Sequence, residues 1–237
     1  MVVTLISAHR GQCGVDGLPA LDRYRRAIEL GVDYIEFDVR RTADDAYVVY
    51  HDPRTPSGRS IGDLTLEVVR AELGAAVLTL RQLFDLAGGR IGLHIDLKEV
   101  GYEAEIVHLA LAHLDFDRFV ITSLEDASIR TIKEHFPRVR AGLSLGRDTD
   151  GMPPWRRLMV RLSELFPDRR LQHCHADFVA AHRQLARIRL LRYCARKGLP
   201  AWVWTVDTEI EMRRFLADRR VATLITNRPD LAVRLRA

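Results

Sequence analysis

Two acidic residues on one expected strand, Glu36 and Asp38, have a spacing that could support chemistry. They alternate with the apolar residues Ile35, Phe37 and Val39, and a period of two indicates a β-strand. Successive strand side chains point to opposite faces, so the two carboxylates share one face and repel each other there. A hard divalent cation, Mg²⁺ or Ca²⁺, would compensate this charge, because carboxylate oxygens are its usual ligands. For such a pair taken alone, the alternative is a half-buried strand with its polar face in water.

Further polar residues stand at the ends of other apolar runs. His9 and Arg10 follow the run Val2–Ser7, and His51 follows Tyr47–Tyr50. Histidine titrates near neutral pH, so one of the two histidines could accept a proton while the other donates one.

A third apolar run, Ile91–Lys98, places His94, Asp96 and Lys98 on one strand face. Asp96 adds a third carboxylate for a cation, while Lys98 and Arg10 could neutralise phosphoryl oxygens as charged donors. If these residues meet at one site, the chemistry they favour is metal-assisted attack on a phosphodiester.

The elements that must position these residues follow from periodicity. Strands are expected to begin near Val2, Tyr34, Ile91, Arg118, Val139, Asp177, Ala201 and Ala222, with Tyr47–Tyr50 as an excursion after the second. Helices are expected over Ala20–Leu30, Leu66–Leu73, Leu80–Leu86, Glu103–Leu114, Ala127–His135, Trp155–Phe166, Gln184–Lys197 and Thr208–Leu216. Arg54–Asp63 and the rest of Gly146–Cys174 are expected to be loops.

Eight strands alternating with helices in about 240 residues are typical of an α/β fold of the (β/α)8, or TIM barrel, kind. We expect a single domain over residues 1–237. A doubly wound open sheet is the alternative, but no glycine-rich nucleotide loop supports it. In such a barrel the polar residues named above gather at the carboxyl ends of the strands, where catalysis takes place.

Composition limits the function classes. The chain has 237 residues, of which 47% are hydrophobic and 29% charged, as in ordinary globular proteins. Its net charge of +4 suits an anionic small molecule but is too diffuse to indicate nucleic-acid binding. The widely spaced Cys13, Cys174 and Cys194 favour a reducing compartment. With no signal-peptide pattern and no apolar run near the roughly 20 residues of a membrane span, we expect a cytoplasmic protein. The sequence indicates no particular oligomeric state.

Several motifs, in order along nearly the whole chain, resemble the glycerophosphodiester phosphodiesterase family. They are AHRG at 8–11, IEFDVRRTADDAYVVYHDP at 35–53, IDLK at 95–98, ITS at 121–123, VWTVD at 203–207 and LITNRPD at 224–230. The resemblance implies a TIM barrel that hydrolyses glycerophosphodiesters to an alcohol and sn-glycerol 3-phosphate, using one divalent cation, Mg²⁺ or Ca²⁺.

The resemblance also assigns roles to individual residues. The catalytic pair would be His9 and His51, and the metal ligands would be Glu36, Asp38 and Asp96. The phosphate contacts would be Arg10 and Lys98. Trp202 and Trp204 point the same way from one strand, and the family motif selects Trp204 as the wall of the substrate pocket.

Three features depart from the family pattern. The segment Leu18–Leu21 lacks the glutamate of the family's PENT motif, Asp96 replaces the usual glutamate, and the helical insertion after HD shrinks to Arg54–Ala76. The first two are similar to the related sphingomyelinase D/phospholipase D branch, which is however secreted and disulfide-bonded. Two alternatives therefore stay open: lysophospholipase D-like cleavage of phospholipid head groups, and an inactive barrel that only binds phosphorylated ligands.

Overall fold

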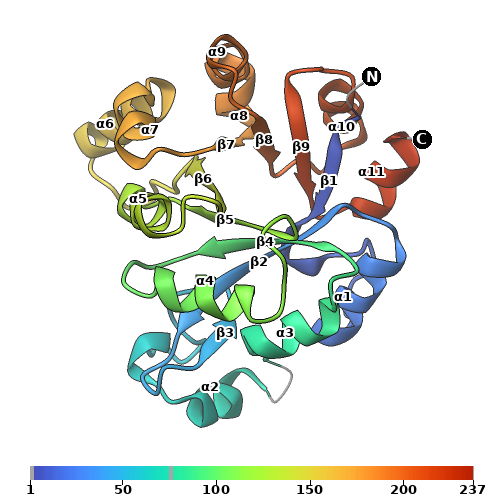
Figure 1. The fold of residues 1–237 in the computed structure, drawn as a ribbon, viewed down its shortest axis with the longest axis vertical. Coiled ribbons are helices and arrows are strands. Elements are labelled where there is room, and N and C mark those ends of the chain that lie inside the picture. Colours follow the sequence, from blue (N-terminus) through green and yellow to red (C-terminus); the bar gives the residue numbers. More distant parts are fainter. Residues whose placement is uncertain (1–2, 75–76, 237) are drawn as a thin grey trace.

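The computed structural model describes residues 3–74 and 77–236, and within these residues eight parallel strands close into a barrel. The strands are β1 (Leu5–Ala8), β2 (Tyr34–Arg41), β4 (Gly92–Leu97), β5 (Phe119–Ser123), β6 (Arg140–Leu145), β7 (Phe178–His182), β8 (Ala201–Trp204) and β9 (Val221–Thr226). Closure comes from β1, which pairs with both β2 and β9. The strands gather at the centre of Figure 1 with the helices around them. The predicted (β/α)8 barrel is confirmed.

Helices connect the strands. They are α1 (Ala20–Glu29), α2 (Leu66–Leu73), α3 (Leu80–Ala87), α4 (Glu103–Leu111), α5 (Asp126–His135), α6 (Pro154–Leu165), α7 (Asp168–Cys174), α8 (Arg183–Leu185), α9 (Leu191–Lys197), α10 (Glu209–Leu216) and α11 (Pro229–Arg236). Short 3₁₀ turns occur at η1 (His9–Gly11) and η2 (Ile61–Asp63), and a π-helical segment, η3 (Ala186–Leu190), joins α8 to α9. No helix among the described residues is both long and apolar enough to cross a bilayer.

Three helical features differ from the sequence expectation. Helix α7 lies in a segment that was expected to be a loop. The helix was missed because its seven residues, which follow Pro167, are too few to show a helical period. Helix α11, which begins at Pro229, was not predicted. The helix expected to be regular over Gln184–Lys197 contains the π-helical η3. Val2 of the first predicted strand and residues 75–76 of the predicted insertion lie outside the described residues.

The strand excursion after β2 has its own small core. Strand β3 (Tyr47–Val49) pairs antiparallel with the end of β2, outside the barrel. A separate apolar cluster supports it, made of Val48, Ile61, Leu64 and Val69. This cluster fixes the segment that carries His51 beside the barrel mouth.

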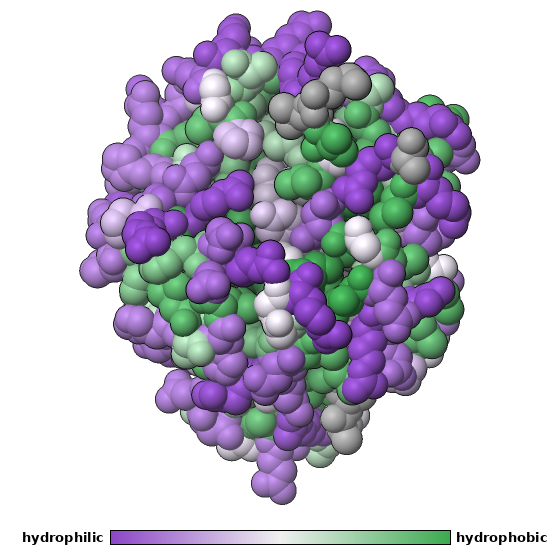
Figure 2. Space-filling model, turned by 45° about the vertical axis from the view of Figure 1, so that its right-hand side comes forward, coloured by the Kyte–Doolittle hydropathy of each residue, from purple (hydrophilic) through white to green (hydrophobic). Residues whose placement is uncertain are grey.

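The barrel has two apolar layers. The larger layer packs the outward strand faces against the helices, and it includes Ile35, Phe37 and Val39. The smaller layer fills the barrel interior, where Trp202 stacks on Phe178 with ring centroids 4.8 Å apart. Hydrophilic side chains form most of the outline of the molecule in Figure 2. The interior aromatic layer is a floor, and the polar residues of the site stand above it.

Candidate active site

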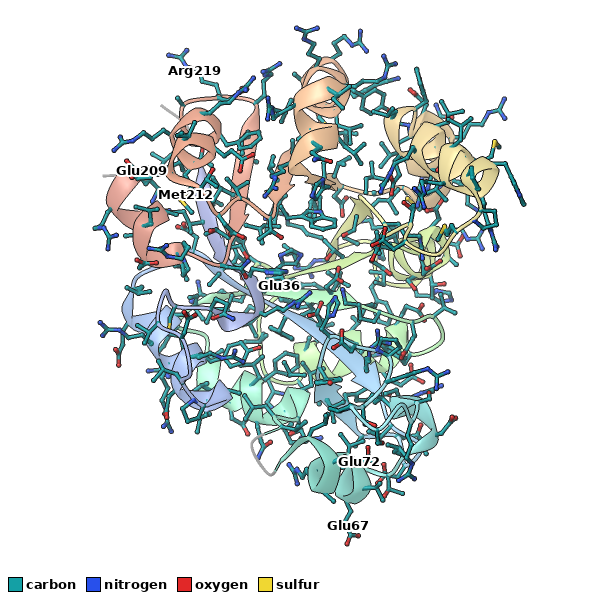
Figure 3. All side chains as sticks on the ribbon, turned by 180° about the vertical axis from the view of Figure 1, so that it is seen from behind. Glu36, Glu67, Glu72, Glu209, Met212 and Arg219 are labelled. Atoms are coloured by element: carbon teal, nitrogen blue, oxygen red, sulfur yellow. The ribbon has the colours of Figure 1, made fainter. Side chains whose placement is uncertain are left out.

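Register between two neighbouring strands assembles the acidic residues. Glu36 and Asp38 are buried on the inner face of β2, and β4 pairs with β2 so that Asp96 stands opposite Asp38. One carboxylate oxygen from each of the three residues lies within 4.8 Å of the others. Figure 3 shows Glu36 at the centre of the fold. The structure therefore brings together the three residues expected to be metal ligands.

Two side-chain cations contact this carboxylate cluster. The Lys98 ammonium lies 2.7 Å from Asp38 Oδ1 and 2.6 Å from Asp96 Oδ2. The Arg10 guanidinium lies 3.1 Å from Asp38 Oδ2, and the Arg10 backbone N–H donates to Glu36 Oε2 at 2.8 Å. Among the described residues, neither cation forms an ion pair with Glu36 itself.

The pKa values in the cluster reflect this uneven pairing, in which the two aspartates have cationic partners and Glu36 has none among the described arginines and lysines. Burial and the nearby Asp38 and Asp96 carboxylates raise the pKa of Glu36 well above its ordinary value. Burial would also raise the pKa of Asp96, but the Lys98 ammonium and the Thr122 hydrogen bond outweigh it and lower that pKa. Burial disfavours the charged form of Lys98, yet the two aspartates outweigh this and raise its pKa. Positive charge is in short supply at Glu36, so a bound divalent cation fits this donor set.

An unusual turn aims Arg10 at the acids. Arg10 has φ 52° and ψ 35°, in the left-handed region that residues with side chains rarely adopt. The next residue, Gly11, has φ 61°, and a Cβ there would lie 2.3 Å from the Tyr24 ring. Only glycine therefore fits the second position of the turn. Conformations of this kind cluster at functional sites because the surrounding structure has to hold them in place.

A chain of hydrogen bonds fixes the proton on His9. Asp207 accepts hydrogen bonds at 2.8 Å from the backbone N–H and the side-chain amide of Asn227. The amide oxygen of Asn227 therefore faces His9 and accepts from Nδ1 at 2.8 Å. Nε2 of His9 is left without a proton, 3.9 Å from Glu36 Oε2. Burial, helped by Arg10, lowers the pKa of His9, which also keeps the ring neutral.

Asp207 and Asn227 had no assigned role in the sequence analysis, although both lie in the quoted motifs VWTVD and LITNRPD. The signal available was a polar residue shortly after each of two late strands, three positions beyond β8 for Asp207 and directly after β9 for Asn227.

His51 is held through its backbone as well as its ring. Its carbonyl oxygen accepts two hydrogen bonds from the Arg40 guanidinium, at 2.9 and 2.7 Å. Its ring Nδ1 is 2.7 Å from Asp52 Oδ1 and donates to it, which leaves Nε2 as the ring atom able to exchange a proton. Arg40 is buried on β2 and also pairs with Glu99. Sequence reasoning gave Arg40 no role, and the signal available was a charged residue on the same strand face as Glu36 and Asp38.

His94 and Thr122 support Asp96 from inside the barrel. The Thr122 hydroxyl donates to Asp96 Oδ1 at 2.5 Å and accepts from His94 Nε2 at 2.8 Å. A carboxylate can only accept, so these directions place the His94 proton on Nε2. Burial lowers the pKa of His94 to about 4, and the ring is neutral at pH 7. Its buried Nδ1 has no hydrogen-bond partner among the described residues.

The two tryptophans of β8 have different surroundings. Trp202 is 1% exposed and lies in the aromatic floor. Trp204, nearer the mouth, is partly exposed and donates its indole N–H to the Ala180 carbonyl at 3.0 Å. Its ring meets His182 edge-on, with centroids 5.4 Å apart. Of the two, Trp204 borders the open space above the floor.

The side chains described above line one cavity of about 220 Å³ at the carboxyl ends of the strands. All eight residues singled out from the sequence border it: His9, Arg10, Glu36, Asp38, His51, Asp96, Lys98 and Trp204. The cavity combines an acidic cluster for one cation, two cationic donors for an anion and two histidines whose Nε2 atoms can exchange protons. This set can bind a phosphodiester and cleave it by general acid–base catalysis.

Comparison with known proteins agrees with this chemistry. Residues 9–231 match the glycerophosphoryl diester phosphodiesterase family. A glycerophosphodiester phosphodiesterase from Caldanaerobacter subterraneus is 27% identical, with 98% of this chain and 97% of that protein aligned. The crystal structure of a glycerophosphodiester phosphodiesterase from Parabacteroides distasonis superposes with a TM-score of 0.80 at 21% identity, covering 98% of this chain and 96% of that one.

A phosphodiesterase from Oleispira antarctica, solved in complex with the product sn-glycerol-3-phosphate, has a TM-score of 0.75 at 17% identity, with 98% and 96% of the two chains covered. The two solved structures share the barrel, and the family match extends over nearly the whole sequence. The chain belongs to the glycerophosphoryl diester phosphodiesterase family.

Proposed function

We propose that the protein hydrolyses glycerophosphodiesters to an alcohol and sn-glycerol 3-phosphate. The observation that carries the proposal is the meeting, in one cavity, of two histidines, a buried three-carboxylate cluster and two cationic side chains. Family membership supports the reaction class, and the relative from Oleispira antarctica was solved with sn-glycerol-3-phosphate bound.

The residues that would hold a divalent cation are Glu36, Asp38 and Asp96. Mg²⁺ or Ca²⁺ bound there would withdraw electron density from a phosphoryl oxygen and stabilise the charge that develops on it. Arg10 and Lys98 both contact Asp38 beside this cluster, and we expect them to bind the remaining phosphoryl oxygens.

The histidine surroundings suggest a division of proton transfers. Asn227 holds the His9 proton on Nδ1, so the cavity-facing Nε2 can take a proton from the attacking water. His51, when protonated on both ring nitrogens and paired with Asp52 through Nδ1, can donate its Nε2 proton to the leaving alcohol oxygen. Trp204 would form one wall of the pocket that holds the substrate.

The test is release of glycerol 3-phosphate from glycerophosphocholine in the presence of Mg²⁺, Ca²⁺ or a chelator. We expect release with a divalent ion and none with the chelator. Calorimetry with Glu36→Ala or Asp38→Ala should show that metal binding is lost. If the folded protein releases nothing with either ion, it is a binding barrel. Choline release from lysophosphatidylcholine alone would instead show a lysophospholipase D.

A further inference from the structure

Helix α6 turns its apolar side away from the barrel. Five apolar residues recur at a spacing of three or four and are 43–69% exposed: Trp155, Leu158, Met159, Leu162 and Phe166, the last at the helix end. We call these five residues the outer stripe. Glu164, on the opposite side, is 1% exposed. An amphipathic helix normally buries its apolar side, so this arrangement is the reverse of the usual one.

Polar contacts hold α6 in place. Glu164 Oε1 accepts hydrogen bonds from the backbone N–H groups of Gly146 and Arg147, at 2.8 and 2.7 Å. Its Oε2 pairs with Arg161 at 2.7 Å, and the partly buried Leu165 packs against the core. The strongest polar anchors of the helix therefore lie on the side opposite the outer stripe. Figure 1 shows α6 at the outer edge of the fold.

The exposed charge of α6 is positive. Arg156 and Arg157 are exposed, and neither forms an ion pair with any described residue. The single acidic residue of α6 is the buried Glu164. Beyond the helix, the Arg189 guanidinium lies 4.2 Å from the centre of the Phe166 ring, which adds another cation beside the outer stripe.

We propose that α6 docks the protein on an anionic lipid surface, with the outer stripe among the headgroups and the arginines against anionic phosphates. Tryptophan, leucine and phenylalanine on one face with arginine on the other are typical of helices that lie in a membrane interface. Glu164 ties the helix to Gly146, which borders the active-site cavity. Docking through α6 would therefore place the lipid headgroups on the side of this helix opposite the cavity, about one helix diameter from Gly146. This inference does not depend on the proposed reaction.

Charge argues for lipid over a second copy of the chain. In a two-fold contact the same patch faces itself, so Arg189 beside one outer stripe would meet no acidic partner, because the exposed charges of α6 in the second copy are also positive. Like charges in contact are unfavourable, whereas anionic headgroups attract each arginine by roughly 1 kcal/mol, a factor of about five in binding.

The test is co-sedimentation with vesicles of phosphatidylcholine alone or mixed with phosphatidylglycerol. We expect binding to the anionic vesicles, none to pure phosphatidylcholine, and loss of binding at high salt. Arg156→Ser combined with Arg157→Ser should weaken binding about 30-fold. Leu158→Ser combined with Leu162→Ser should weaken it by about tenfold or more. Ile210→Ser on α10, which removes an isolated residue that is 83% exposed, is the matched control and should bind like the parent.

Two further measurements distinguish lipid docking from misfolding of the variants and from dimerisation of the parent. Melting temperatures close to that of the parent would show that the variants fold. Leu158 is 59% and Leu162 43% exposed, so we expect only a small loss of stability. Trp155 fluorescence should shift to the blue on anionic vesicles, and Trp155→Phe should abolish the shift. Equal binding to both kinds of vesicle, or none to either, would overturn the proposal. So would a parent dimer that the double leucine variant converts to monomer without any vesicle binding.

Discussion

Replacing Asn227 with leucine tests whether the proton on His9 is fixed from outside the cavity. Leucine keeps the approximate volume but removes the amide oxygen that accepts from His9 Nδ1 at 2.8 Å. The ring can then carry its proton on either nitrogen, and Nε2 is no longer held free to accept one. A matched change is Asp207→Asn. An amide at 207 can donate to Asn227, whose own amide would turn its NH₂ toward His9 and force the His9 proton onto Nε2.

The structure sets the expected size of both effects. Asn227→Leu loses the hydrogen bond to His9 and the one to the Asp207 carboxylate, which cost about 1 and about 2 kcal/mol of stability, while Asp207→Asn exchanges partners. A domain of ordinary stability should still fold in both cases. General acid–base catalysis raises the rate by a factor of roughly 10²–10⁴. A misplaced proton should cost a factor near the lower end of that range. We therefore expect kcat to fall about 10²-fold, or about 2.7 kcal/mol in the barrier. KM should change little, because neither residue borders the cavity.

The assay is steady-state hydrolysis of glycerophosphocholine, paired with ¹⁵N NMR of the histidine rings. The parent should show His9 protonated on Nδ1, and Asp207→Asn should show it protonated on Nε2. Normal kcat in both variants, with the proton moved as expected, would refute the assignment of His9 as the base. An unmoved proton in Asp207→Asn would refute the hydrogen-bond directions.

Three other substitutions test neighbouring parts of the site. Lys98→Met should lower kcat by roughly 10²-fold or more while Mg²⁺ affinity, measured by calorimetry, holds or rises, because a cation that repels the metal is removed. Lost metal binding with unfolding would instead make Lys98 structural. Trp204→Phe should raise KM with little change in melting temperature, whereas Trp202→Phe in the aromatic floor should lower the melting temperature with near-normal kinetics. The pKa of His94 is about 4 in the folded protein and 6.5 in the unfolded chain. Between pH 4 and pH 6.5 the unfolded chain therefore binds more protons, and the stability of the fold decreases as the pH is lowered. By pH 5 this should cost about 2 kcal/mol, and denaturation at pH 7 and pH 5 should show that His94→Asn lacks this loss.

Strand parity made much of the site predictable from sequence. Glu36 and Asp38 face the cavity because they alternate with apolar residues that pack outward, and a period of two is legible in any single strand. Asp96 and Lys98 follow from the same reasoning on the next barrel strand. The barrel was predicted from the number and alternation of strands and helices. That number rests on many residues, so an error at the end of one strand or helix does not change the prediction.

Side-chain pairing across elements was not predictable in this way. The Arg40 guanidinium donates hydrogen bonds to the His51 carbonyl oxygen because β3 folds back on β2. No local sequence pattern predicts that these two groups come into contact. Helix α6 was predicted from its periodicity, but the same periodicity indicates a buried apolar side. In the structure the side of α6 that carries Glu164 faces the loop after β6, and the apolar side faces outward. Contacts of this kind, between a helix and a distant loop, are not encoded in the periodicity of the helix.

Closure of the barrel explains why the group that orients His9 was missed. His9 and Asn227 are 218 positions apart, and they meet because β1 pairs with β9, in a register that sets Ala8 opposite Thr226. The residue after each strand end then faces the other across the seam. Sequence reasoning can place both residues at the mouth, but it does not fix the register of the seam, and a slip of one residue reverses which side chains face inward. The proton position on the proposed base thus depends on the last strand of the chain, and only the closed barrel makes that dependence visible.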